Sequence, residues 1–312
     1  MSDETIERTF VTSLPARLNL SNIRGKVEIL PHADGPTGEP GKEVVTVTAV
    51  KHNGLGNSGR TQVIMEQAQD GSLTIETKYN NAFWFNNPCA VDYTVRMPRN
   101  SVVKVSGVSN STSLQGLQGE FTVESVSGTI RIKDLAGPIS LHSVSGEILG
   151  EGLSGELKFD TVSGKVSLLT SDLATVDGST VSGSVTLEKL SGGGPYRFNS
   201  VSGGLRLSLP DNTGCTVEME SLSGQVKSNL PVTAQWSNGH RHPGGKQHVE
   251  INGGGVSVNF SSVSGSLWLD GSGQVNQAPA PLEEPESPTT MEILEKIERG
   301  ELSVEEGLKK LK

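Results

Sequence analysis

The sequence predicts an all-β fold, a parallel β-solenoid, followed by a small C-terminal helical hairpin. A repeat of 18–21 residues is too short for a propeller blade or a helical-pair repeat, and it suits one coil of a β-solenoid. A weaker glycine signal lies halfway between the repeats, at Gly119, Gly137 and Gly155. The repeat itself is a Ser-Val-Ser-Gly phrase or a near variant, which ends at Gly128, Gly146, Gly164, Gly183, Gly203, Gly224 and Gly265, in steps of 18, 18, 19, 20, 21 and 41 residues.

Residues 1–100 form an irregular beginning of the predicted solenoid. Segments in which apolar and polar residues alternate with a period of two are expected to be strands. They are 16–20, 26–30, 44–50, 62–65, 73–77 and 91–97. Clusters of turn-forming residues separate some of them, as at 32–42 and 53–60. Because the 18-residue period is not visible here, we expect coils with longer loops.

Residues 101–270 carry the regular repeat, and residues 129–146 are one example coil. Ile130 and Ile132 alternate with a polar residue, Ile139 and Leu141 do the same after a turn, and Val144 is then expected to point inward. Stacked coils place like side chains in columns about 4.8 Å apart. One predicted core column is Val126, Val144, Val162, Val181, Val201, Leu222 and Val263, and a second is Ile130, Ile148, Val166, Val185, Leu205, Val226 and Leu267.

Two consequences follow from this interpretation. Val162→Asp would place a charge in a dry core and cost several kcal/mol of stability. The long step to the last repeat, with a degraded repeat near 240–250, indicates a loop insertion there.

The C-terminal segment changes character twice. Residues 271–290 form a Pro-rich linker that is expected to be extended. Residues 291–312 have apolar residues at helical spacing, Gly300 fits a helix C-terminus, and Ser303 with Glu306 forms a capping box, so a two-helix hairpin is predicted. So short a hairpin cannot bury a sufficient core by itself and is expected to dock on a partner, on a second copy or on its own solenoid. Its candidate contact residues are Ile293, Leu294, Ile297, Val304, Leu308 and Leu311.

Composition limits the classes of partner. The net charge of −9 over 312 residues argues against nucleic acid and against electrostatic binding to anionic membranes. The sequence has no signal-peptide pattern and no apolar run of about 18–20 residues that would span a bilayer. A cytoplasmic location is therefore expected, with non-classical export left open. Cys89 and Cys215 are expected to be free thiols.

The repeat Ser-Val-Ser-Gly-x-Ile/Val, preceded by Val91-Asp-Tyr-Thr-Val-Arg-Met-Pro98, resembles a bacterial β-solenoid family of unknown function whose members are labelled putative adhesins. The resemblance covers roughly residues 10–270 and implies a right-handed β-helix without catalytic residues. The tail from Ile293 to Leu311 resembles the short two-helix SHOCT-like domain. Some relatives that carry it are linked to bacterial cell-envelope stress, and in several of them the helices precede the solenoid.

Candidate metal sites are weak, and no cofactor is expected. A nine-residue glycine rhythm is typical of calcium-binding β-rolls, but those need aspartate at a fixed place in each repeat, and the aspartates here follow no such register. His240, His242 and His248 lie within the Gly-rich segment 236–248 and could bind zinc or nickel. A loop with glycines and a proline is poorly preorganised, which favours a solvated loop.

Two other features could serve a partner. Phe83, Trp84 and Phe85, flanked by asparagines, could form an adhesive tip, or they could pack over an open side or end of the solenoid. The serine column could present a ladder of hydroxyls, but hydrogen bonds to turn backbone are the expected role. That column is Ser127, Ser145, Ser163, Ser182, Ser202, Ser223 and Ser264.

An enzyme is not expected. The carboxylates Glu147, Asp160, Glu188 and Glu218 lie on different coils, and nothing brings two of them within the 5–9 Å or so that glycoside hydrolysis requires. The sequence therefore predicts a non-catalytic scaffold or protein-interaction module. The first alternative is a cytoplasmic polymer built by end-to-end stacking of solenoids, and the second is a surface protein that binds or cleaves carbohydrate.

Overall fold

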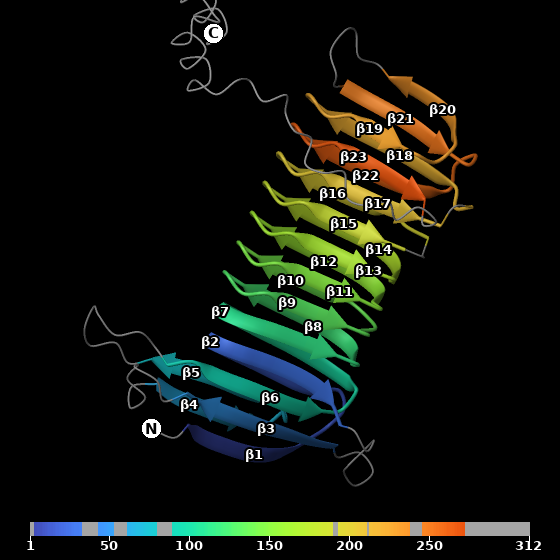
Figure 1. Ribbon diagram of the computed structural model, residues 1–312. Coiled ribbons are helices and arrows are strands. Elements are labelled where there is room, and N and C mark those ends of the chain that lie inside the picture. The colour runs from blue at the N-terminus through green and yellow to red at the C-terminus, as the bar shows by residue number, and fades with distance from the viewer. Residues whose placement is uncertain are drawn as a thin grey trace, which may run out of the picture. The chain divides into compact units, whose positions relative to one another are not determined.

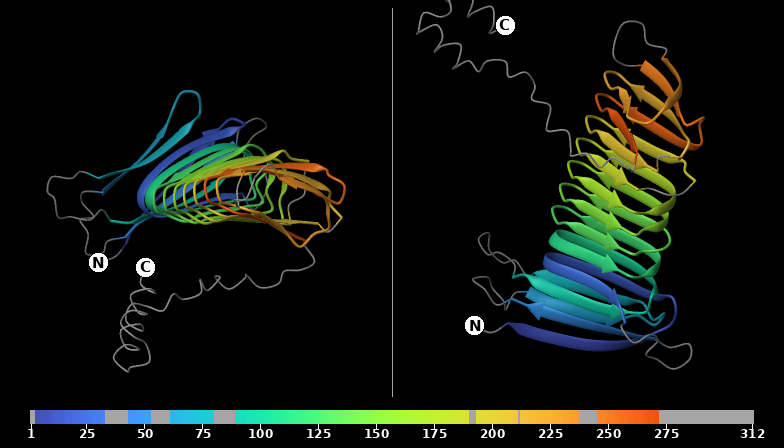
Figure 2. Two further views of the ribbon diagram at one scale, coloured as in Figure 1. Left: turned by 90° about the horizontal axis from the view of Figure 1, so that it is seen from above. Right: turned by 45° about the vertical axis from the view of Figure 1, so that its right-hand side comes forward.

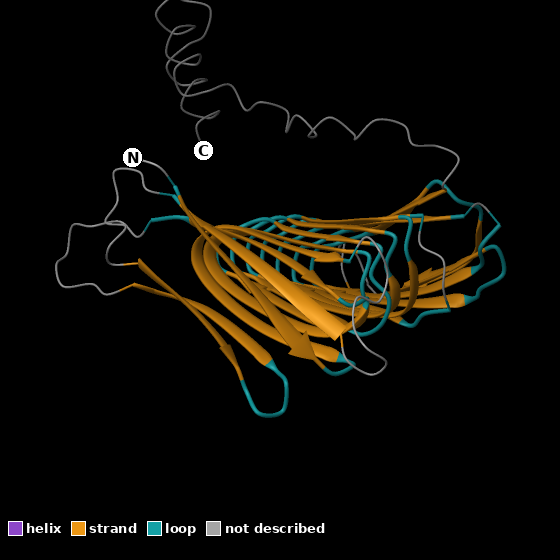
Figure 3. Cartoon of the chain, turned by 90° about the horizontal axis from the view of Figure 1, so that it is seen from below, coloured by secondary structure: helices purple, strands orange, loops and turns teal. Residues whose placement is uncertain are grey.

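The computed structural model describes residues 3–32, 43–52, 61–79, 89–189, 193–210, 212–237 and 245–271. The chain divides into two compact units, Met1–Gly273 and Gln274–Lys312, and every described residue belongs to the first. All elements of the described residues are β-strands (Figures 1 and 3). The predicted hairpin at 291–312 lies outside the described residues.

Each central coil gives one strand to each of two parallel ladders, which stack side by side along the unit (Figure 1). Leu141 lies level with Val123 of the coil before and with Phe159 of the coil after, so a period of 18 residues keeps the coils in register. This confirms the predicted parallel solenoid. The first ladder contains β8 (Gln118–Ser125), β10 (Ile139–Ser143), β12 (Ser154–Thr161), β14 (Asp172–Thr180) and β16 (Tyr196–Ser200). The second contains β9 (Ile130–Lys133), β11 (Ile148–Glu151), β13 (Val166–Leu169), β15 (Val185–Glu188) and β17 (Leu205–Leu209).

The core lies between the two ladders, inside the arch that Figure 2 shows end-on. The predicted column that begins at Ile130 is confirmed, because its members are buried except for Val226, which is partly buried at the last coil. Phe121, Leu141, Phe159 and Phe198 face it from the first ladder. Each such side chain contributes about 1.5–3 kcal/mol by leaving water, so the column stabilises every coil through its neighbours.

At the N-terminal end the spatial order of the coils departs from the chain order. The long strand β2 (Ala16–Pro31) pairs in parallel with the long strand β7 (Asn100–Gln115) on one side. Its other side pairs with β5 (Leu73–Tyr79) and then with β6 (Val91–Met97), which come later in the chain. The coil built from β2 is therefore enclosed between two coils that follow it in sequence (Figure 1).

The C-terminal end has the same kind of inversion. The last coil consists of β22 (Val256–Ser262) and β23 (Leu267–Gly271). It lies between the coil of β16 and β17 and the coil of β18 (Cys215–Ser221) and β19 (Val226–Ser228). In the column of turn residues, Val263 therefore lies between Val201 and Leu222, although it follows both in the chain. Of the expected loop insertion near 240–250, residues 245–250 belong to β21 (Gly245–Ile251), which pairs with β20 (Val232–Ser237), and residues 240–244 lie outside the described residues.

Both ends of the described unit finish in antiparallel strands. At the N-terminal end β3 (Glu43–Lys51) pairs antiparallel with β6, β1 (Glu4–Thr12) with β3, and β4 (Thr61–Gln67) with β5. At the C-terminal end β21 pairs antiparallel with β18, and β20 with β21. These strands are not coils of the parallel stack. The irregular spacing of residues 1–100 reflects this change of direction.

Candidate binding surface

The turn between the two ladders consists of the repeated Ser/Thr-Val-Ser-Gly phrase, and its polar groups are satisfied inside the turn or by the adjacent coil. In the coil that ends at Gly146, the Ser143 hydroxyl accepts a hydrogen bond from the Gly146 N–H at 3.0 Å. The Ser145 hydroxyl donates to the carbonyl of Val126 at 3.1 Å. The first bond closes the turn, and the second ties it to the preceding coil.

Both bonds recur along the stack. The glycine N–H of seven turns donates to the Ser or Thr three residues earlier at 2.6–3.1 Å. Six members of the predicted serine column donate to a valine carbonyl of the coil below at 3.1–3.4 Å, which confirms their expected role in holding turn backbone. The hydroxyls are thus engaged with backbone and do not form a free ladder.

The valine of each turn points outward, which corrects the predicted inward column. These valines are 45–49% exposed and the corresponding leucine is 76% exposed. The reason is the alternation of the strand: Leu141 and Ser143 face inward, so Val144 must face outward. We call this column the valine ridge, and in spatial order it is Val108, Val126, Val144, Val162, Val181, Val201, Val263 and Leu222. The expected large cost of Val162→Asp is therefore wrong.

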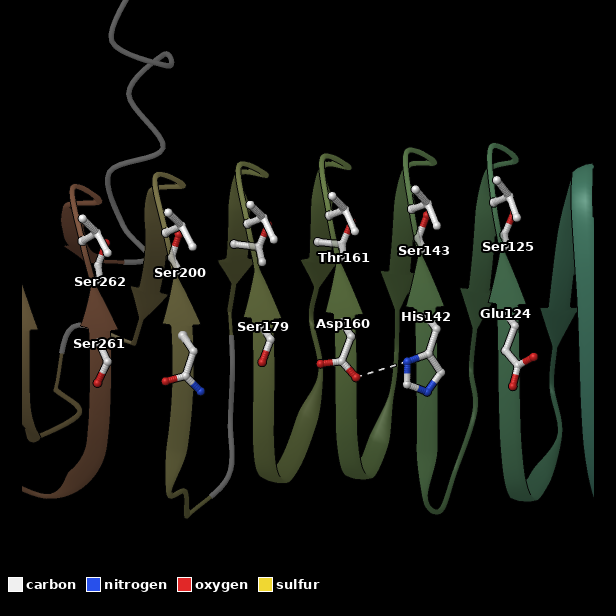
Figure 4. A pocket seen from close by; sticks show the side chains of 18 of the residues that line it. Glu124, Ser125, His142, Ser143, Asp160, Thr161, Ser179, Ser200, Ser261 and Ser262 are labelled. Carbon is white, nitrogen blue, oxygen red and sulfur yellow. Dashed lines mark ion pairs between the residues drawn. The ribbon is translucent and has the colours of Figure 1, made fainter.

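A second column of outward side chains runs parallel to the ridge, each one residue before an inward Ser or Thr, or before Gly107 in the first turn. We call it the polar row, and in spatial order it is Ser106, Glu124, His142, Asp160, Ser179, Asn199, Ser261 and Glu220. The valine ridge, from Val126 to Val263 in spatial order, and the polar row flank an open groove of about 990 Å³, which the inward Ser and Thr residues between them also line (Figure 4). The groove crosses the coils, parallel to the stacking direction.

The charges of the groove lie in its polar row. His142 Nδ1 is 3.1 Å from Asp160 Oδ2, the ion pair drawn dashed in Figure 4, and His142 Nε2 is 3.2 Å from Ser140 Oγ. Glu124 forms an ion pair with Lys104 at 3.2 Å. The next three positions of the row, Ser179, Asn199 and Ser261, carry no charge, so the groove is neutral between Asp160 and Glu220.

Ser140, His142 and Asp160 are the residue types of an acyl-transfer triad, and their hydrogen bonds run in the order that such a triad uses. That chemistry also needs donors aimed at the developing oxyanion. Here the strand is paired in parallel on both sides, so its N–H groups are taken up by the ladders. The array is suited to fixing the His142 ring as a hydrogen-bonding part of the groove wall.

The carboxylates considered above for glycoside hydrolysis do not share the groove. Asp160 on β12 and Glu218 on β18 are separated by β14, β16 and β22, so their strands lie about 19 Å apart. Glu188 lies on β15, in the other ladder. Of the four, only Asp160 lines the groove.

Of the metal candidates, His248 lies on β21, with Nε2 3.3 Å from Glu250 Oε1 and its ring stacked on Trp236 at 5.2 Å. His240 and His242 lie outside the described residues. Within the ranges that the structure describes, no group of three or more His, Cys, Asp and Glu side chains could hold a metal ion. The ring of His248 serves as a surface on which Trp236 packs.

The aromatic candidates Phe83, Trp84 and Phe85, and all the hairpin candidates from Ile293 to Leu311, also lie outside the described residues. Cys89 and Cys215 are free and buried, and burial raises the pKa of the Cys215 thiol to about 12, which keeps it protonated and unreactive. A search of the described residues for a helix long and apolar enough to cross a membrane finds none.

Sequence reasoning missed the groove, although a signal for it was present. The alternation that places Ile139 and Leu141 inside continues to Ser143, which puts Val144 outside and His142 beside it. The sequence analysis expects the repeated apolar residue of each turn in the core, whereas the structure places it at the surface. Asp160 was the one polar-row residue that the sequence singled out.

Comparison with known proteins gives a family and distant structural neighbours. The model of the family described as Toastrack DUF4097 matches residues 39–266. A putative cell adhesion protein from Clostridium sporogenes is 12% identical with a TM-score of 0.28, over 86% of this chain and 100% of that one. A putative adhesin from Bacteroides fragilis is 10% identical with a TM-score of 0.38, over 86% and 97%. A putative adhesin from Parabacteroides distasonis is 12% identical with a TM-score of 0.37, over 85% and 97%. No curated protein matches the chain.

Proposed function

Because this chain belongs to the Toastrack DUF4097 family, whose fold it shares, we propose that it works as a non-catalytic protein-interaction module that binds through the valine ridge and the adjoining groove. The observation that carries this proposal is the ridge itself. Seven turns place a valine, and one a leucine, at positions that are about half exposed and that the core does not need. A contiguous apolar patch on a soluble protein is typical of an interaction site.

The groove supplies the polar part of such a site. Its row of Ser, Asn, His and carboxylate side chains offers both hydrogen-bond donors and acceptors beside the apolar ridge. Apolar contacts with a polar rim are the usual anatomy of a protein interface. A binding role therefore involves both the valine ridge and the polar row. Hydrolysis would involve only Ser140, His142 and Asp160.

The predicted hairpin at 291–312 belongs to the same proposal as a second contact, through self-association or a partner protein. Its apolar residues at helical spacing support this role. A cytoplasmic location remains part of the proposal. So does a link to bacterial envelope stress, which the resemblance of the tail to SHOCT-like domains implies.

End-to-end stacking into a polymer finds little support at the described ends. A continuing stack would add parallel coils, but β1, β4 and β20 are antiparallel to the strands beside them. β1 also carries Glu4, Glu7 and Arg8, and charged side chains on an edge strand oppose further pairing.

The test is affinity capture of partner proteins from a lysate of the source cell, with three purified proteins as matched baits. They are the wild type, a ridge variant with Val144→Thr, Val162→Thr, Val181→Thr and Val201→Thr, and a chain that lacks residues 291–312. Threonine keeps the branched shape and removes the apolar surface. We expect a protein that the wild type retains, that the ridge variant loses, and that binds again when both proteins are purified. Equal capture by the wild type and the ridge variant would contradict the proposal.

A second assay tests the non-catalytic part. The wild type should not accelerate hydrolysis of activated esters. Turnover that disappears with Ser140→Ala and with His142→Ala would instead establish an enzyme.

A further inference from the structure

We propose that the groove binds a second copy of this chain, with the ridge of each copy in the groove of the other. This inference rests on the proposed function and names the partner of that site. Three properties of the surface favour this occupant: the spacing of the ridge, the position of the ridge beside the groove, and the placement of the charges.

The first property is the spacing. The ridge repeats once per coil, about every 4.8 Å. An extended peptide presents side chains on one face about every 6.7 Å, and an α-helix advances 5.4 Å per turn. The side chains of a peptide or a helix would therefore not stay level with the ridge residues over eight coils, whereas the side chains of a second stack of coils would. When equivalent coils of two copies lie side by side, their ridge residues stay level even where the repeat lengthens from 18 to 21 residues.

The second property is self-complementarity. The ridge and the groove lie side by side and run along the same coils, from the turn of β7 to that of β22. A two-fold axis parallel to the stacking direction turns one copy to face the other and places equivalent coils at the same level. With that axis midway between ridge and groove, each ridge enters the groove of the other copy. A pair of this kind is closed, because the same patch is used on both sides.

The third property is the placement of the charges. In this arrangement the two ridges form the centre, and the two polar rows lie at the outer edges. Glu124, Asp160 and Glu220 then stay in contact with water at the rim and do not face their own copies. The Ser and Thr residues between the two columns already accept the glycine N–H bonds of the turns, so covering the groove leaves these N–H groups paired.

The experiment is sedimentation velocity of the full chain over a range of concentrations. For this measurement the ridge variant carries only two of its four substitutions, Val162→Thr and Val181→Thr. The control combines Val11→Thr with Val232→Thr, which are exposed valines off the ridge. We expect the wild type and the control to dimerise alike, and the ridge variant to dimerise about tenfold more weakly or worse, because the dimer loses four apolar contacts. All three should melt at similar temperatures, since none of the four valines is buried.

Single cysteines test the geometry. Cys89 and Cys215 are buried and can stay in place. Under mild oxidation Val126→Cys and Val201→Cys should each cross-link to an identical chain, and a mixture of the two should give no mixed product. A predominant mixed product would mean antiparallel copies and would overturn the arrangement proposed here.

Two further outcomes would overturn the inference. One is a wild type that stays monomeric at about 100 µM, a concentration at which even weak dimers form. If the ridge of such a monomer still captures another protein, the proposed function stands without a second copy. The other is a dimer that persists in the ridge variant and disappears on deletion of residues 291–312, which would assign self-association to the hairpin.

Discussion

The two serines of each turn perform different tasks although they lie only two residues apart. Ser143 faces inward and accepts the N–H of Gly146, while Ser145 lies at the surface and donates to a carbonyl of the neighbouring coil. Thr161 and Thr180 replace the inward serine in two coils, because their hydroxyls make the same bond. The inward position therefore requires a hydroxyl group, and it accepts either serine or threonine.

Ser143→Ala should destabilise the protein by about 1–3 kcal/mol, because the buried N–H of Gly146 loses its acceptor. Ser143→Thr should be close to neutral. Ser145→Ala should cost less than Ser143→Ala, since the carbonyl of Val126 keeps its bond from the backbone N–H of Ser145. Urea unfolding of the three variants measures these differences. Equal losses for Ser143→Ala and Ser145→Ala would contradict the assigned roles.

The glycine that ends each turn is required because the backbones of stacked turns are close together, and not because of a left-handed backbone conformation. A Cβ built on Gly146 would lie 1.8 Å from the carbonyl oxygen of Gly128 in the coil below. The backbones of stacked turns approach so closely that no side chain fits between them. Left-handed geometry matters instead at the opposite corner, as at Gly137 with φ 125°.

Gly146→Ala should therefore be strongly destabilising, by several kcal/mol, because two backbones must separate. Gly193→Ala is the matched control, since a Cβ there meets nothing within 4 Å. Thermal unfolding of both variants, followed by circular dichroism, is the measurement. A Gly146→Ala protein as stable as the control would show that the turns are not stacked as described.

At the scale of the strand, the sequence predicted the ladders well and the turns poorly. The column that begins at Ile130 could be predicted because its members alternate with polar residues on short strands of the same register. The valine column could not be placed by hydropathy alone, since a turn interrupts the alternation that decides which side faces inward. Continuing that alternation through Ser143 gives the observed outward direction of Val144.

The first strand is attached to the rest of the unit by an ion-pair cluster at its beginning. His52, just after β3, has Nε2 2.8 Å from Asp92 and Nδ1 3.0 Å from Asp3. The hydrogen bond to Asp92, and then that to Asp3, raises the pKa of His52 above 6.5, its ordinary value. Both ring nitrogens donate only when the ring is protonated, so the cluster needs the charged form.

The contribution of His52 should therefore depend on pH in a defined direction. Because its folded-state pKa is raised, the stabilisation is fully present below its unfolded-state pKa and is lost as pH rises through the folded-state value. His52→Gln should melt below the wild type at pH 5 and together with it at pH 9. The ring is 41% exposed, so the effect should be modest and should shrink in high salt. A difference that grows with pH would refute the assignment.

At the scale of the whole described unit, the sequence could not reveal which coil lies on which. Every repeat carries nearly the same phrase, so the turn that ends at Gly265 fits between those of Gly203 and Gly224 as well as beyond them. Stacking energy per coil is similar in either place, and local patterns hold no information on the choice. The position of the β2 coil could not be predicted either, because residues 1–100 do not show the repeat.

The antiparallel ends have a consequence for how far the stack of coils can grow. A parallel stack exposes two sheet edges that would pair with further coils, and strands of reversed direction stop that growth. At the C-terminal end the side chain of Gln247 also bonds to the Gly224 carbonyl and the Val226 N–H, across the open end of the coil formed by β18 and β19. Growth is therefore limited at the ends, while the long side of the stack presents the valine ridge.

The central claim is that the turn valines form a presented surface and the strand valines form the core. Urea unfolding of Val162→Asp and Val166→Asp, at protein concentrations low enough to avoid association, tests it most directly. The two residues lie in the same coil, Val162 about half exposed and Val166 fully buried. We predict that Val162→Asp changes the free energy of unfolding by about 0.5 kcal/mol or less, and that Val166→Asp removes several kcal/mol or prevents folding. Comparable losses in the two variants would contradict the claim.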